Sequence, residues 1–178
     1  MKRLILMFIA LSSLLLCSCG SKSESSEPAF SMTNSNGDII NLYMPREEAI
    51  KILGETNPNQ IGMYEYDTIT IGFTHDEVSY ISSSSNEWSL ADGNTAGNKI
   101  NYPNQYPNQY VSADNMIYLK YFKKNNEKYT TIAKDNLPKK LISDDFKAFQ
   151  CIEIHAKNDD VSSIFIYDSY VARTAFFD

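Results

Sequence analysis

The sequence predicts an α+β fold, in which an antiparallel β-sheet carries few short helices and is built from one clear and one degenerate helix–hairpin repeat. Three observations predict it. A short amphipathic helical pattern over 45–53 precedes a period-2 alternation of apolar residues over 63–82. A second pair of alternating segments lies within 149–167. Both pairs contain Val-Ser-x-Ile, at 78–81 and 161–164, which indicates duplicated units that share one sheet or form two stacked sheets.

The helix is predicted to begin at Pro45, because proline has a helical φ and its missing N–H is not needed at the first helical position. Glu47 and Glu48 follow in the first turn, where carboxylates favour the positive end of the helix dipole. Gly54 offers the left-handed stop. One face is expected to be apolar and consists of Ala49, Ile52 and Leu53. A helix this short needs a packing partner.

That partner is predicted in the segments that follow. Ile69, Ile71 and Phe73 alternate with polar or small residues, as in a half-buried strand. A polar turn over 74–77 leads to a second strand over 78–82. Helix and hairpin therefore form one unit, with an antiparallel sheet covered on one face.

This unit resembles the repeat of the β-lactamase-inhibitor-protein-like and BamE/SmpA-like small bacterial lipoproteins. The matching residues are Ile-Leu-Gly-Glu at 52–55, Ile-Thr-Ile-Gly-Phe at 69–73 and Glu-Val-Ser-Tyr-Ile at 77–81. The resemblance implies a first repeat over about 39–85 and a second half over about 98–178. It also implies binding of another protein, since the members of the family that are known to act do so by protein contact.

Residues 1–18 are expected to be a lipoprotein signal peptide, with two basic residues before an apolar run from Leu4 to Leu16. That run is too short to span a membrane. It ends in Leu-Cys-Ser-Cys-Gly at 16–20, which resembles a bacterial lipobox. The resemblance implies a diacylglycerol thioether on Cys19, with further acylation by a fatty acid such as palmitate. An ordinary secretory signal with two incidental cysteines is the alternative.

The lipidated cysteine is expected to be joined to the domain by a flexible tether. Residues 19–38 are rich in Ser, Asn and Glu and offer little apolar surface to bury. A globular α+β domain is then expected over 39–178. Several acyl chains on one cysteine would anchor it durably to the bacterial membrane, on the cell surface or the periplasmic face.

Charge excludes one class of partner. The chain has 16 basic and 22 acidic side chains, a formal charge of −6. Loss of residues 1–18 removes Lys2 and Arg3 and makes the balance more acidic. Nucleic-acid binding requires a basic stripe, so no nucleic-acid partner is expected. The lysines at 120, 123, 124 and 128 favour a solvated loop over an anion site.

Trp88 is the single tryptophan and lies in a Ser-, Asn- and Gly-rich segment over 83–97 that is predicted to link the two halves. Two interpretations stand: a hydrophobic plug between the halves, or an exposed aromatic anchor for a protein partner. The first of these is the favoured interpretation.

A tandem Tyr-Pro-Asn-Gln duplication over 102–109 is followed by a third tyrosine. Its prolines exclude a regular helix and a central strand. Tyr102, Tyr106 and Tyr110 supply rigid amphipathic contact area. The duplication indicates either a tolerant loop or a ligand-facing tyrosine loop. A turn of helix is still expected over 111–114.

Strands are further predicted over 115–122, 129–133, 149–156 and 161–167, and a short helix over 134–147. The tail, 169–178, ends in Ala-Phe-Phe and is expected to dock on the core.

No catalytic or metal-binding pattern is expected. The two histidines, His75 and His155, lie far apart in the sequence. Cys151 and His155 face the same side of one predicted strand, but four residues of strand separate them by about 13 Å, too far for a nucleophile and its base. Cys151 is therefore predicted to be a small buried hydrophobe.

The sequence thus predicts a protein that is not an enzyme and uses no cofactor or metal. We expect a lipid-anchored extracytoplasmic protein-interaction module, with Trp88, Tyr102, Tyr106 and Tyr110 as candidate partner-binding residues. The alternatives are a small-ligand-binding envelope lipoprotein of the substrate-binding type and, less favoured, a hydrolase with a convergent polar pocket.

Overall fold

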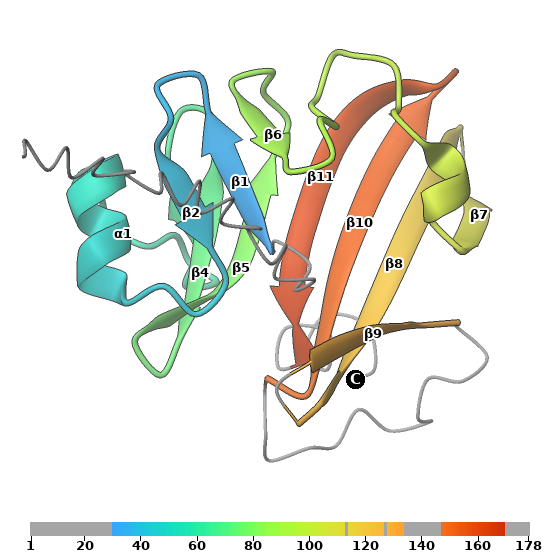
Figure 1. Ribbon diagram of the computed structural model, residues 1–178. Coiled ribbons are helices and arrows are strands. Elements are labelled where there is room, and N and C mark those ends of the chain that lie inside the picture. The colour runs from blue at the N-terminus through green and yellow to red at the C-terminus, as the bar shows by residue number, and fades with distance from the viewer. Residues whose placement is uncertain (1–29, 113, 127, 134–146, 170–178) are drawn as a thin grey trace, which may run out of the picture.

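Two antiparallel β-sheets and one α-helix make up the part of the chain that the computed structural model describes, residues 30–112, 114–126, 128–133 and 147–169 (Figure 1). The small sheet has the order β2-β1-β6. Its strands are β1 (Ser31–Asn34), β2 (Ile39–Asn41) and β6 (Trp88–Leu90).

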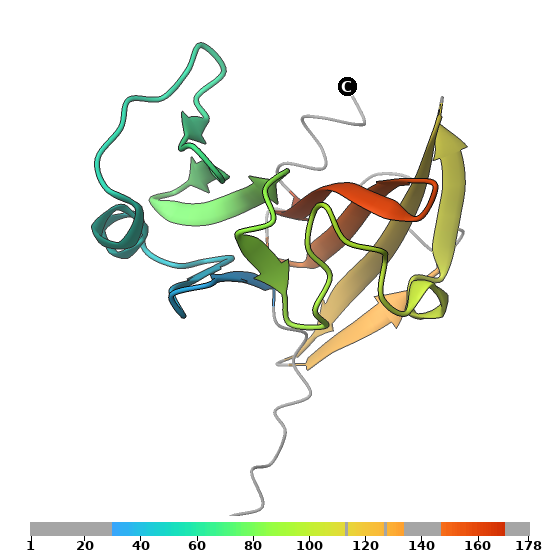
Figure 2. The same cartoon turned by 90° about the horizontal axis from the view of Figure 1, so that it is seen from above.

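The large sheet has eight strands in the order β3-β4-β5-β11-β10-β8-β7, with β9 also paired to β8. Its strands are β3 (Tyr64–Glu65), β4 (Thr70–Thr74), β5 (Glu77–Ser83), β7 (Asn108–Ser112), β8 (Asn115–Asn125), β9 (Lys128–Ile132), β10 (Phe149–Lys157) and β11 (Asp160–Asp168). Seen from above, the helix lies at one end of this sheet, and β7 and β9 lie at the other (Figure 2).

The predicted α+β class, with one clear and one degenerate helix–hairpin repeat, is wrong, because antiparallel strands dominate and the described residues contain one α-helix. As Pro103 and Pro107 predict, the tyrosine segment forms no regular helix. There the chain forms a single 3₁₀ turn, η1 (Pro103–Gln105), and then β7. The helical turn expected over 111–114 is wrong as well, since β7 continues to Ser112. The helix predicted over 134–147 and the docked tail lie almost wholly outside the described residues.

The one helix, α1 (Arg46–Leu53), forms where the sequence predicts it. Pro45 is its N-cap rather than its first helical residue, and its carbonyl accepts hydrogen bonds from the N–H groups of Glu48 and Ala49. Gly54 ends the helix with φ of 91°, a positive value that glycine adopts without strain. Ala49 is fully buried, and Ile52 and Leu53 pack against the same core, as the apolar spacing predicts.

The repeated Val-Ser-x-Ile pattern marks two hairpins of the same build. The turns His75-Asp76 and Asn158-Asp159 each have two residues with positive φ, as a two-residue hairpin loop with the right twist requires. In both hairpins the register shifts at the serine of the pattern, so that this residue bulges. β5 and β11 also pair with each other. The two hairpins therefore share one build and one sheet, while the described residues hold a helix before the first hairpin alone.

The fold begins earlier than predicted. Residues 31–38, assigned from composition to the tether, form β1 and a tight turn in which the Asn34 side chain accepts hydrogen bonds from the backbone N–H groups of Asn36 and Asp38. Phe30 packs edge-on against Phe122 and Tyr129, with centroids 5.0 Å apart in each pair. A few apolar residues were enough to order this segment, because β1 lies between β2 and β6 and bonds to both.

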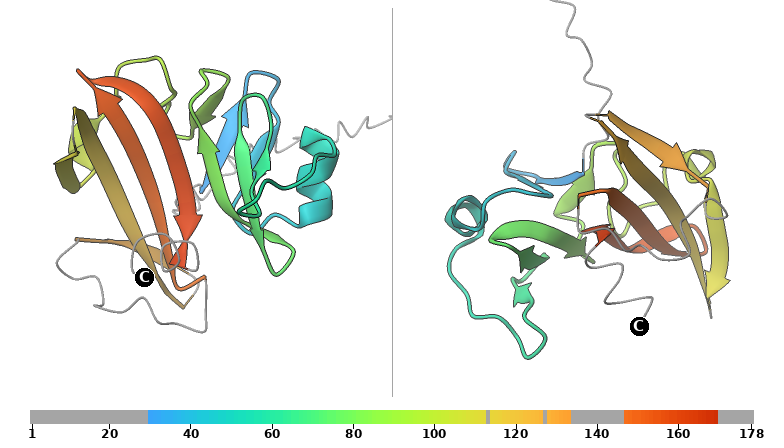
Figure 3. Two further views of the ribbon diagram at one scale, coloured as in Figure 1. Left: turned by 180° about the vertical axis from the view of Figure 1, so that it is seen from behind. Right: turned by 90° about the horizontal axis from the view of Figure 1, so that it is seen from below.

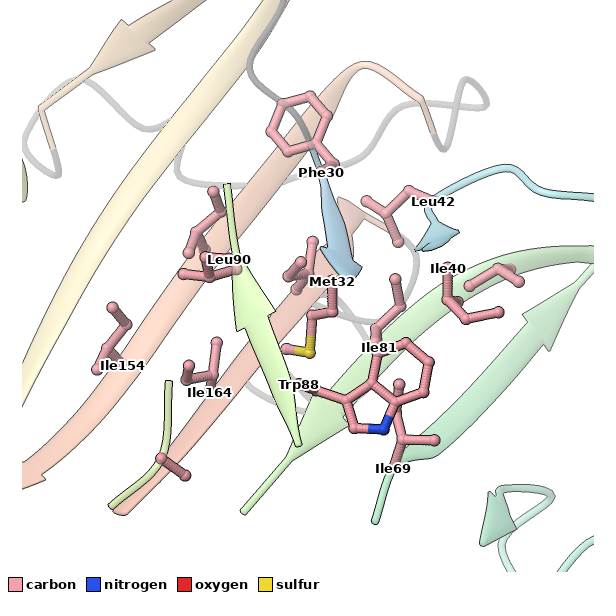
Figure 4. Close-up of a cluster of buried hydrophobic side chains, with 14 of the residues drawn as sticks. Phe30, Met32, Ile40, Leu42, Ile69, Ile81, Trp88, Leu90, Ile154 and Ile164 are labelled. Atoms are coloured by element: carbon pink, nitrogen blue, oxygen red, sulfur yellow. The ribbon is translucent and has the colours of Figure 1, made fainter. Parts of the chain in front are cut away.

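The main core lies between the two sheets (Figure 4). The small sheet contributes Met32, Ile40, Trp88 and Leu90, and the large sheet contributes isoleucines of β4, β5, β10 and β11. A second apolar cluster lies on the opposite face of the large sheet, which we call the outer face (Figure 3, left). It contains Ile117, Leu119, Cys151 and Tyr167.

Candidate interaction surface

The outer face is made by the residues that alternate with the core isoleucines, since successive side chains of a strand point to opposite faces. Strand pairing places Thr70, Ser82, Phe165, Glu153, Leu119 and Asn108 in one row across the sheet, from β4 to β7. The neighbouring row is Gly72, Tyr80, Tyr167, Cys151 and Tyr121. One end of this face is therefore rich in hydroxyl groups, and its middle is aromatic.

A buried carboxylate stands in that aromatic middle. Glu153 receives a hydrogen bond of 2.8 Å from the Tyr167 hydroxyl at one oxygen, and its other oxygen lies 2.5 Å from Nε2 of His155. Each carboxylate oxygen thus has a protein partner, as a buried charge requires. The His155 ring also packs against Phe165, with centroids 4.9 Å apart.

This cluster does not provide an activated nucleophile. Burial raises the pKa of the Cys151 thiol, and the charge of Glu153 raises it further, although a hydrogen bond with Tyr167 acts in the opposite direction. Burial also raises the pKa of Tyr167, which stays a hydrogen-bond donor to Glu153. A thiol with a raised pKa is a poor nucleophile at neutral pH. The prediction that Cys151 is a small buried residue is confirmed.

The tyrosine segment splits into a buried and an exposed part. Tyr106 is 2% exposed, and its hydroxyl donates to Asp92 at 2.8 Å and accepts a hydrogen bond from Asn94 at 3.4 Å. Burial, together with the nearby charge of Asp92, raises the pKa of Tyr106. Tyr106 therefore anchors the loop to the domain, and its ring is not available to a partner.

The two other tyrosines are open to solvent. Tyr102 is 63% exposed and Tyr110 is 40% exposed. Tyr102 has a φ of 50°, a left-handed conformation that is uncommon for residues other than glycine. Tyr110 faces the same side as its pair partner Ile117, so it extends the aromatic outer face to the edge of the sheet.

β7 is that edge, and it is unusually unprotected. It pairs with β8 on one side, and no described strand pairs with its other side. Natural edge strands carry charges that discourage further pairing, but residues 100–113 contain no Asp, Glu, Lys or Arg. Val111, near the end of this stretch, is 68% exposed.

Trp88 lies in the core, in agreement with its interpretation as a hydrophobic plug and not with that of an exposed anchor. It is 3% exposed, and its indole N–H donates to the Thr68 hydroxyl at 3.0 Å. The segment predicted as a linker, 83–97, contains β6 and so belongs to the fold. Burial removes Trp88 and Tyr106 from the candidate partner surface and leaves Tyr102 and Tyr110.

Sequence reasoning missed two contributors to this surface. Val111 falls in the helical turn predicted over 111–114, although its position after a proline-rich segment and next to Tyr110 is typical of an edge strand. Glu153 is not among the predicted site residues, although a charged residue between two isoleucines in a predicted strand must face away from the core. Cys19 lies outside the described residues.

Within the described ranges, no group of three or more potential metal ligands converges. No helix among these residues is long and apolar enough to cross a membrane. Comparison with known proteins finds no matching family model, no matching curated protein and no matching solved structure.

Proposed function

We propose that this protein is a lipid-anchored, extracytoplasmic binding module that captures an extended segment of another envelope protein along β7. The observation that carries the proposal is the distribution of exposed apolar side chains. Five large hydrophobic residues are exposed among those described, and Tyr102, Tyr110 and Val111 fall within ten consecutive positions. The remaining two, Ile39 and Ile61, lie in other parts of the fold.

Strand addition fits this surface. An extended peptide that adds to a sheet edge gains main-chain hydrogen bonds, and its alternate side chains find pockets or apolar neighbours. β7 offers an uncharged backbone edge for the first contribution and Tyr110 with Val111 for the second. Tyr102 adds a rigid aromatic side chain next to the edge.

The anchor is proposed from the lipobox-like sequence at Cys19. Cys19→Ala should lose its acyl chains and move the protein from the membrane fraction to the soluble extracytoplasmic fraction, because a single residue carries the attachment. Labelling with a palmitate analogue in intact bacterial cells, followed by fractionation, measures both effects. A Cys19→Ala variant that still takes up the label and still pellets with membranes would contradict lipid attachment at Cys19.

Site-specific photo-crosslinking in intact cells tests the binding surface. A photoreactive phenylalanine analogue at position 102, 110 or 111 should give one discrete protein adduct. The same analogue at position 39 or 61 serves as the matched control, because Ile39 and Ile61 are also exposed and apolar, at 49% and 79%. The adduct should be absent from these two sites.

Adding Val111→Lys should reduce the adduct at position 110 by at least about tenfold, since a lysine on an edge strand opposes the addition of another strand. The free energy of unfolding should change by no more than about 0.5 kcal/mol, as is usual for an exposed site. An equal adduct yield with and without the lysine would contradict strand addition at β7. Equal adducts at all five positions would mean nonspecific contact.

A further inference from the structure

The hydroxyl-rich end of the outer face contains a pocket of about 220 Å³. It lies where the segment before β4, the end of β5 and the middle of β11 come together, at the end of the large sheet opposite β7. The volume is smaller than the roughly 300–1,000 Å³ of pockets that enclose a drug-sized ligand. It therefore suits a ligand of about one ring.

Hydroxyl groups predominate among the polar side chains of this pocket. Six serine or threonine residues line it, together with a single carboxylate, that of Asp67. Ser83 and Thr68 are already engaged, since the Ser83 hydroxyl donates to the Thr68 carbonyl at 2.7 Å and the Thr68 hydroxyl accepts from Trp88. These two bonds fix the floor of the pocket to the core.

Other polar side chains of the pocket remain available. Thr70, Ser163, Ser84 and Asp67 make no side-chain hydrogen bond or ion pair within the described ranges. Thr70 and Ser163 project from strands on the outer face, so their positions are set by the sheet. Preset donors and acceptors lower the entropy cost of binding a ligand.

Two aromatic rings complete the pocket and are held in place. Phe165 is wedged between His155 and Tyr80, at centroid distances of 4.9 Å and 6.4 Å. Tyr66 is fixed through its hydroxyl, which donates to the Gly54 carbonyl at 3.1 Å. The pocket thus pairs fixed apolar ring surface with a set of hydroxyl groups.

We propose that this pocket binds one neutral sugar ring of a glycan. A pyranose has apolar C–H patches that pack on an aromatic ring and hydroxyl groups that both donate and accept. Asp67 would accept hydrogen bonds from sugar hydroxyls, and charge-assisted bonds of this kind are the stronger ones. A small organic cation suits the site less well, because one exposed carboxylate is its sole charge, and the surrounding hydroxyl groups would be left without partners.

Saturation-transfer NMR on the full-length protein in a detergent without a sugar headgroup tests this site. The probes are the methyl glycosides of glucose, galactose, mannose and N-acetylglucosamine, with choline as the cationic comparison. We expect at least one glycoside to bind with a millimolar or lower Kd and choline not to bind. Asp67→Asn and Ser163→Ala should each weaken that binding by about tenfold.

Glu87→Gln is the matched control, because Glu87 is an exposed carboxylate outside the pocket, and it should bind the glycoside as the unsubstituted protein does. The proposal is overturned if no glycoside binds at millimolar concentration, if choline binds in their place, or if the Asp67 and Ser163 variants bind normally. This pocket is independent of the strand-addition surface. Asp67→Asn should keep the crosslinked adduct at position 110, so failure of one proposal is distinguishable from failure of the other.

Discussion

Trp88→Ala is expected to lower the free energy of unfolding by about 3–5 kcal/mol, the range for removing a buried tryptophan or phenylalanine. The side chain lies between the sheets, near Met32, Ile69 and Ile81 (Figure 4). Its removal would leave a cavity and would also take a hydrogen bond from Thr68. A domain with a total stability of about 5–15 kcal/mol would lose a large share of it.

Urea unfolding followed by far-UV circular dichroism measures this loss, because Trp88 is the single tryptophan and the variant has no indole fluorescence. Tyr102→Ala is the control and should change stability by no more than about 0.5 kcal/mol, since its ring is exposed. Trp88→Phe should cost less than Trp88→Ala, because the ring fills part of the space. Similar stabilities for Trp88→Ala and Tyr102→Ala would contradict the placement of Trp88 in the core.

The hairpins were predictable because their signals are local. Each signal extends over a few residues. The signals are the alternation of Ile69, Ile71 and Phe73, a two-residue turn made of residue types that tolerate positive φ, and the repeated Val-Ser-x-Ile. The helix α1 has the same property, with a proline before it and Gly54 after it. These elements form where the sequence places them.

The small sheet could not be predicted from local patterns. β1, β2 and β6 have three or four residues each, and β6 comes from a segment whose composition is that of a linker. What orders them is contact between distant parts of the chain, as in the pairing of Met32 with Leu90. The degenerate second helix–hairpin repeat failed for a related reason, since it rested on the family resemblance, while Pro103 and Pro107 exclude a regular helix at that place in the chain.

The position of the candidate surface in the chain could be predicted from the sequence, but which of its tyrosines are exposed could not. The uncharged tyrosine segment stands out in the sequence, and Tyr102 and Tyr110 are exposed as a binding role requires. Composition cannot show which tyrosine faces inward, because that depends on Asp92 and Asn94, which reach Tyr106 across the loop. The sugar-sized pocket draws on three separate segments, and none of them carries a motif of its own.

Alkaline pH is expected to destabilise the protein steeply. Tyr106, Tyr167 and Cys151 are buried, and their pKa values in the folded protein are raised above the ordinary values of 10.0 for tyrosine and 9.0 for cysteine. Below those ordinary values both states hold the protons, so these groups add no pH dependence. Above them the unfolded chain releases protons that the folded protein keeps, and the free energy of unfolding falls as pH rises.

Each such group contributes a slope of up to about 1.4 kcal/mol per pH unit, so the three together approach about 4 kcal/mol per unit above pH 10. Urea unfolding at intervals from pH 8 to 11 measures the slope. Tyr106→Phe and Tyr167→Phe should each reduce the slope by the contribution of one ionisable group. The double variant should reduce the slope by the contribution of two groups, because the two phenols belong to separate hydrogen-bond networks. The slope is the informative quantity, because either substitution can also shift the whole curve through its lost hydrogen bond. A slope that stays the same in all three variants would show that these phenols ionise as readily in the folded protein as in the unfolded chain.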